Sequence, residues 1–183
     1  HVVTESIQDS VDEMIMLANE YGIKQFVIGM PNKLEESVLR ERSLVLFSVT
    51  ERLKSCGARL LIHNNKPDTA VKINGKTALE TLVDLCDGKV GFQLDLGWCA
   101  AGGEDPIAFF KRNESRVESL HFKDFVKPEI SESDVTIGSG SIDTKSAIEI
   151  AKKLRIPMLI DQDSYGDIRV DLKKSAEFII KKS

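Results

Sequence analysis

Residues 59–65 read Arg-Leu-Leu-Ile-His-Asn-Asn, an apolar run that ends in His63, a side chain of a metal-binding type. Apolar runs that end or nearly end in His or Asp recur at 90–96, 117–122 and 157–161. Short, continuously apolar strands are typical of parallel sheets, because helices cover such sheets and bury both faces. These stretches therefore predict the central strands of a parallel sheet.

Helical patterns alternate with the strands. Gln25–Gly29 is a further predicted strand, and His1–Thr4 could be the end of another. Apolar residues at helical spacing, glycine stops and Asp N-caps predict the helices. The predicted helices span residues 6–21, 34–56, 77–86, 106–111, 143–154 and 170–180.

This alternation gives six strand–helix units and places the chain in the α/β class. We expect residues 1–183 to form a single domain. A closed (β/α)8 TIM barrel needs eight units and ~250 residues. The six units fit either a barrel whose first two units lie outside this sequence, or an open doubly wound sheet. No GxGxxG loop follows the first strands, so a dinucleotide-binding fold is not supported.

Composition excludes several classes of protein. The formal net charge of -4 argues against a general nucleic-acid binder, which needs a basic face. No apolar run approaches the ~18 residues of a membrane span, and no signal peptide is visible, so no membrane partner is expected. The three cysteines form no CxxC pair, which fits a reducing compartment and predicts a cytoplasmic protein.

Four strand ends carry groups that can bind a divalent metal: His63, Asp95, His121 and Asp161. The carboxyl ends of parallel strands meet at one rim, where barrels place their sites. Two imidazoles and two carboxylates suit Mn, Zn, Fe or Co better than Ca, and Mg is also a candidate. Taken singly, each residue is as well explained as a structural histidine or a helix N-cap.

Three further residues stand near these positions. Lys123 follows His121 at the spacing that puts both side chains on one side of a strand, so its ammonium could hold a substrate or enolate oxygen. Asp68 could act as a general base, or could only shape the turn beside Pro67. Trp98 could pack against the apolar side of a sugar ring, or could simply pack under a loop.

Several short motifs follow one another along almost the whole chain. They are His63 to Asp68, Gly75 to Leu79, Asp95 to Trp98, Gly103 to Pro106, His121 to Asp124, Gly138 to Asp143 and Asp161 to Asp163. In this order they resemble the xylose-isomerase-like TIM barrels, the sugar phosphate isomerases/epimerases. The resemblance implies a divalent metal near the strand ends and isomerisation or epimerisation of a small sugar or polyol through an enediolate. It also raises a homodimer as a candidate assembly.

The predicted roles follow from this resemblance together with the strand-end pattern. The metal ligands are His63, Asp95, His121 and Asp161. The predicted catalytic residues are Asp68, Asp161 and Lys123. The predicted substrate-binding residues are Asn65, Trp98 and Asp163.

Three positions depart from the family pattern. Asn65 stands where a second His is usual, and Asp68 and Asp161 stand where Glu is usual. A carboxylate set back by one methylene can weaken catalysis. An inosose-type dehydratase and a catalytically degenerate sugar-binding barrel therefore remain alternatives. The DNA-repair endonuclease branch of the barrel is disfavoured, because it needs more metal ligands and a basic DNA face.

Overall fold

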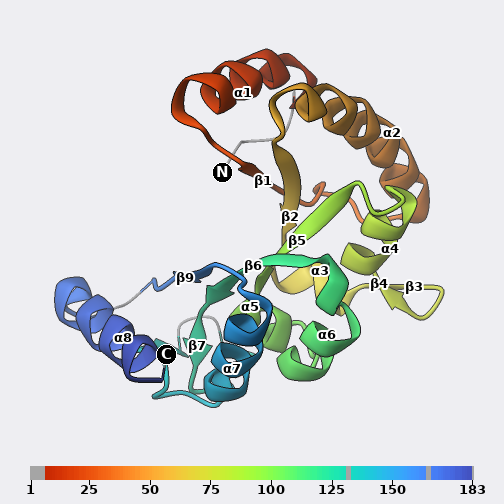
Figure 1. The fold of residues 1–183 in the computed structure, drawn as a ribbon. Coiled ribbons are helices and arrows are strands. Elements are labelled where there is room, and N and C mark those ends of the chain that lie inside the picture. Colours follow the sequence, from red (N-terminus) through yellow and green to blue (C-terminus); the bar gives the residue numbers. More distant parts are fainter. Residues whose placement is uncertain (1–6, 131–132, 164–165, 183) are drawn as a thin grey trace.

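The computed structural model describes residues 7–130, 133–163 and 166–182. Its main sheet contains five parallel strands in the order β1-β2-β5-β6-β9. These strands are β1 (Gln25–Gly29), β2 (Arg59–His63), β5 (Val90–Asp95), β6 (Val117–Phe122) and β9 (Met158–Ile160). The sheet curls as it passes from β1 to β9 (Figure 1). The strand predicted at His1–Thr4 lies outside the described residues.

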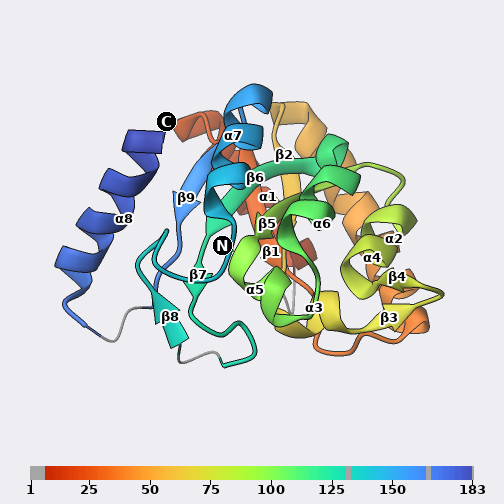
Figure 2. The ribbon, with the colours of Figure 1, turned by 90° about the horizontal axis from the view of Figure 1, so that it is seen from below.

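Helices follow the strands in chain order. The longer ones are α1 (Ile7–Tyr21), α2 (Glu36–Leu53), α4 (Ala78–Leu85), α6 (Pro106–Arg112), α7 (Thr144–Leu154) and α8 (Ile168–Lys182). α1 and α2 lie at the β1 end of the sheet and α8 at the β9 end (Figures 1 and 2). Asp105 and Asp143 cap α6 and α7 as predicted, since each carboxylate accepts hydrogen bonds from the first turn of its helix.

Short elements fill the connections. They are η1 (Lys54–Cys56), α3 (Lys66–Ala70), the β3 (Lys72–Ile73) and β4 (Lys76–Thr77) hairpin, α5 (Leu96–Ala101), η2 (Glu114–Arg116) and the β7 (Asp124–Phe125) and β8 (Asp134–Val135) hairpin. The sequence predicted none of these as separate elements, and the residues of η1 were expected to be the end of the helix at 34–56. Within the described residues, no helix is both long and apolar enough to cross a membrane.

The two faces of the sheet have different chemistry. Leu60, Phe92 and Leu120 are fully buried and belong to the apolar core that the helices complete. Side chains alternate along a strand, so the neighbouring positions point to the opposite, concave face. That face carries polar residues, among them Gln93 and Ser119, which are direct partners in the strand register. The alternation thus separates the core from the surface on which the site is built.

Candidate metal centre

Strand register brings the predicted ligands together. Asp95 at the end of β5 pairs with His121 on β6, and His63 at the end of β2 pairs with Gln93, two residues before Asp95. Beyond β9, the backbone N–H of Asp161 donates to the carbonyl oxygen of Phe122 at 3.0 Å, which extends the alignment to the fourth residue. All four side chains therefore stand at the carboxyl ends of adjacent strands.

The four side chains form one compact cluster. One ligand atom from each of His63, Asp95, His121 and Asp161 lies within 4.8 Å of the others. The two imidazole rings meet edge to face, with ring centroids 4.8 Å apart. His121 Nδ1 lies 3.5 Å from Asp161 Oδ2. The convergence that strand-end spacing predicted is thus present in the structure.

Protonation states favour metal binding. Burial, and then the neighbouring His121, lowers the pKa of His63 to about 4, so this imidazole is neutral at neutral pH. Contact with His121 outweighs burial and, aided by Lys123, lowers the pKa of Asp161 to about 2. A neutral imidazole and an ionised carboxylate are the forms that act as metal ligands.

Asp95 provides the clearest indication of a bound cation. Its side chain is fully buried, and Oδ1 accepts a hydrogen bond from the backbone N–H of Trp98 at 2.7 Å. Oδ2 is buried with no hydrogen-bond partner among the described residues. Burial and the neighbouring Asp161 carboxylate raise the pKa of Asp95 more than the Trp98 N–H and the charge of Lys123 lower it, so an ionised carboxylate there needs further positive charge. A divalent cation beside Oδ2 would supply that charge, so the donor set fits a metal.

Lys123 adjoins the cluster and is 1% exposed. Its Nζ lies 2.7 Å from Asp163 Oδ2 and 3.5 Å from Asp161 Oδ1. Burial alone would lower the pKa of Lys123, but the hydrogen bond to Asp163 and the charge of Asp161 outweigh it, and the net pKa is raised. The ammonium therefore stays charged. Trp98 is half-buried and its ring centroid lies 5.4 Å from the same Nζ.

Two predicted residues lie outside the cluster. Asn65 is exposed and is the N-cap residue before α3, and its backbone N–H donates to Asp68 Oδ2 at 2.6 Å in a capping box. Burial raises the pKa of Asp68 to about 6, a value that suits a general base. Its carboxylate is nevertheless engaged with its own helix. The structure therefore shows a helix-capping role for Asp68, and its role in proton transfer stays a prediction.

Sequence reasoning missed several polar residues around the cluster. Gln93 and Ser119 lie two residues before Asp95 and His121, and period-two spacing within an apolar strand could have identified them. Asp134 on β8 accepts the backbone N–H of Asp163 at 2.5 Å. No sequence signal identifies Asp134, because its position depends on the β7–β8 hairpin.

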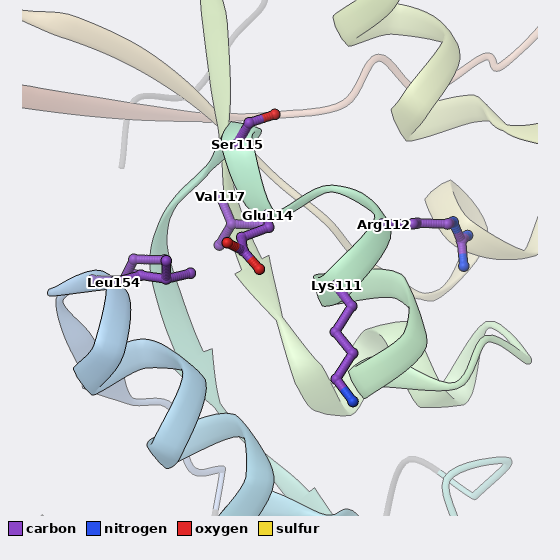
Figure 3. A pocket seen from close by; sticks show the side chains of 7 residues that line it. Lys111, Arg112, Glu114, Ser115, Val117 and Leu154 are labelled. Carbon is purple, nitrogen blue, oxygen red and sulfur yellow. The ribbon is translucent and has the colours of Figure 1, made fainter.

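A separate hollow lies at the other end of β6. It is lined by Lys111, Arg112, Glu114, Ser115, Val117, Leu154 and Ile156 (Figure 3). Val117 begins β6, whereas His121 lies near its end. The hollow is therefore distinct from the cluster, and barrel enzymes place their chemistry at the carboxyl ends of the strands.

Solved structures match the fold closely. A sugar phosphate isomerase/epimerase from Parabacteroides distasonis has a TM-score of 0.76 and 20% identity, over 96% of this chain and 64% of that one. The probable 3-DHS dehydratase AsbF from Bacillus anthracis has a TM-score of 0.80 and 12% identity, over 96% of this chain and 70% of that one. The IOLI protein with a binding zinc atom has a TM-score of 0.72 and 16% identity, over 96% and 67%.

The chain has the fold of the xylose-isomerase-like TIM barrels. Its curled parallel sheet corresponds to part of such a barrel, which favours the barrel over the open doubly wound alternative. The chain spans 64% of the Parabacteroides structure. No protein-family model and no curated protein matches the sequence. At identities of 20% and below, the likeness establishes the fold of this chain and leaves its reaction to be argued from the site.

Proposed function

We propose that the chain carries the metal site of an isomerase or epimerase that acts on a small sugar or polyol through an enediolate. One observation carries the proposal: four ligand atoms from His63, Asp95, His121 and Asp161 converge within 4.8 Å at the carboxyl ends of adjacent strands. The mixed nitrogen and oxygen donors favour Zn, Co, Mn or Fe, with Mg as a weaker candidate. When bound, such a metal would polarise the carbonyl and neighbouring hydroxyl of the substrate.

Asp161 is the cluster carboxylate best placed for proton transfer. Its side chain is 30% exposed, whereas Asp95 is completely buried. Asp161 would take the proton from the carbon next to the substrate carbonyl and return it to the adjacent position. This assignment requires that one carboxylate both binds metal and moves the proton. Asp68 stays the alternative base that the sequence predicted.

Lys123 would hold the negative oxygen of the enediolate. Its charge is fixed by Asp163 and Asp161, and its burial limits competition from water. The half-buried Trp98 ring beside Lys123 would pack against the apolar side of the substrate. Asp163, which is exposed and near Lys123, would accept hydrogen bonds from substrate hydroxyl groups.

A dehydratase is the second candidate. It begins with the same proton abstraction and then expels a hydroxyl group from the neighbouring carbon. The similarity in fold to a probable dehydratase, at a TM-score of 0.80, supports this reaction as the second candidate. A barrel that binds a sugar without catalysis is the remaining alternative.

Metal content and isotope exchange test the proposal. We expect purified protein to bind about one equivalent of Zn²⁺ or Co²⁺, and His121→Ala to lose it. Asp143→Asn is the matched control, since Asn also caps a helix and Asp143 lies outside the cluster. Absence of metal in the wild type after Co²⁺ addition would contradict the metal site.

Turnover in D₂O tests the chemistry. Ketoses and inososes incubated with the metal-loaded protein should gain deuterium at the carbon next to the carbonyl, as read by NMR. Asp161→Asn should abolish exchange, whereas Asp68→Asn should retain it. A product that has lost one water molecule relative to the substrate identifies a dehydratase. Binding without exchange in the whole substrate set supports the non-catalytic alternative.

A further inference from the structure

Asn64 connects two of the cluster residues without belonging to the cluster. It follows His63 directly and its side chain is completely buried. Its Nδ2 donates to the carbonyl oxygen of Asp95 at 3.1 Å, and its Oδ1 accepts from the backbone N–H of Asp95 at 2.8 Å. The side-chain amide thus presents to β5 the same donor and acceptor pair as a peptide group.

These two bonds lie beyond the end of the regular ladder between the strands. The register between β2 and β5 ends at His63 and Gln93, two residues before Asp95. The Asn64 amide therefore joins the strands where their own backbone pairing stops. It connects the residue next to one predicted ligand with the backbone of another.

The bridge also constrains how Asp95 can present its carboxylate. The backbone N–H and carbonyl are held by Asn64, and Oδ1 is held by the backbone N–H of Trp98. Of these four polar groups of Asp95, Oδ2 alone is buried without a hydrogen-bond partner among the described residues. With its other three polar groups held in place, Asp95 has only Oδ2 left to bind a cation. Such preorganisation lowers the entropy cost of binding, because fewer groups must be ordered when the ligand arrives.

We propose that Asn64 is a positioning residue that sets the separation and orientation of His63 and Asp95 for metal binding. The inference rests on the proposed metal site. Groups that orient ligands commonly change metal affinity 10- to 100-fold when they are removed. The amide is needed because a carboxylate lacks the donor for the Asp95 carbonyl and an aliphatic side chain lacks both groups.

Co²⁺ is the probe for this inference, because its visible absorption reports ligand geometry as well as occupancy. We expect Asn64→Ala to raise the Co²⁺ dissociation constant by about 10- to 100-fold and to shift the absorption bands. Asn64→Asp keeps the acceptor for the Asp95 N–H and provides a second, more conservative variant, with an effect in the same direction.

Asn113 gives a matched control. It is also a buried asparagine, and its amide donates to Glu80 and to the carbonyl of Phe109, away from the cluster. Asn113→Ala should lower the urea midpoint but leave the Co²⁺ affinity and spectrum unchanged. If Asn64→Ala and Asn64→Asp bind Co²⁺ like the wild type, the positioning role is wrong and the metal site stands. If the wild type binds no Co²⁺, the proposed function itself fails and the positioning role fails with it.

Discussion

At the scale of single residues, Gly97 shows how closely the site is packed. A Cβ atom at this position would lie 2.8 Å from Cβ and Cγ of Lys123 and 2.9 Å from the ring of Phe125. Contacts this short force neighbouring atoms to move. The absence of a side chain at Gly97 is therefore a requirement for the present position of Lys123.

Gly97→Ala should consequently displace Lys123 and destabilise the fold by about 1–3 kcal/mol, the usual cost of overpacking. Urea denaturation measures the stability. Turnover of a substrate shows whether the displacement of Lys123 lowers activity. Gly29→Ala is the control, because a Cβ there meets no atom within 4 Å and its φ is ordinary. Equal stability of the two variants would show that the Lys123 region adjusts without cost.

At the scale of secondary structure, Glu80 connects α4 with the end of α6. Its carboxylate accepts from the N–H and hydroxyl of Thr77 in a capping box, and from Arg112 and Asn113. Burial alone would raise the pKa of Glu80, but these hydrogen bonds outweigh it and lower the pKa to about 2. The ionised form is thus strongly preferred in the folded state.

This shift predicts an acid-sensitive contribution to stability. The folded pKa of about 2 lies below the ordinary glutamate pKa of 4.5, so the contribution is complete above pH 4.5 and is lost as the pH falls towards 2. We expect Glu80→Gln to lower the free energy of unfolding at pH 7 by about 2 kcal/mol and to flatten its decline in that window. Urea midpoints measured across the pH range give both quantities.

Glu36→Gln provides the comparison for Glu80. Glu36 forms an exposed pair with Arg40 one helical turn away, and such pairs contribute less than about 1 kcal/mol. A similar loss in both variants, or an unchanged pH slope in Glu80→Gln, would contradict the role given to the buried carboxylate.

The sequence predicted the elements that have a strong local signal. Val90–Asp95 and Val117–Phe122 are recognisable because their apolar runs are long enough to cross the core. α3 and α5 have 5 and 6 residues, too few for a helical period, and the β7–β8 pair depends on contacts between residues nine positions apart or more. At the site, the strand-end pattern predicted the four residues that the structure brings together. The hydrogen bonds from Asn64 to Asp95 could not be predicted, because a side chain that bonds to another strand leaves no local pattern in the sequence.

At the scale of the whole molecule, the last helix is attached through a buried polar contact. Ser175 on α8 is completely buried, accepts from the backbone N–H of Ile137 at 3.0 Å and donates to Gln162 Oε1 at 2.7 Å. Gln162 lies between Asp161 and Asp163 in sequence. The attachment of α8 is therefore connected with the chain segment that supplies one predicted ligand.

Ser175→Ala should leave the Ile137 N–H and the Gln162 amide oxygen without this partner in a buried setting. We expect a loss of about 1–3 kcal/mol in unfolding free energy, measured by urea denaturation. Ser55→Ala serves as the control, because that hydroxyl is exposed and bonds within its own turn. A loss no larger than the control would mean that α8 is held by its apolar contacts alone.

The alternating faces of the sheet have a consequence for how such proteins diverge. Leu60, Phe92 and Leu120 hold the helices, while their strand neighbours His63, Gln93 and His121 face the opposite side. A substitution on the concave side can change a reaction without disturbing the packing that keeps the barrel folded. Mutations can therefore change the chemistry one position at a time while the fold is kept. This agrees with solved structures that share the fold of this chain at only 12–20% identity.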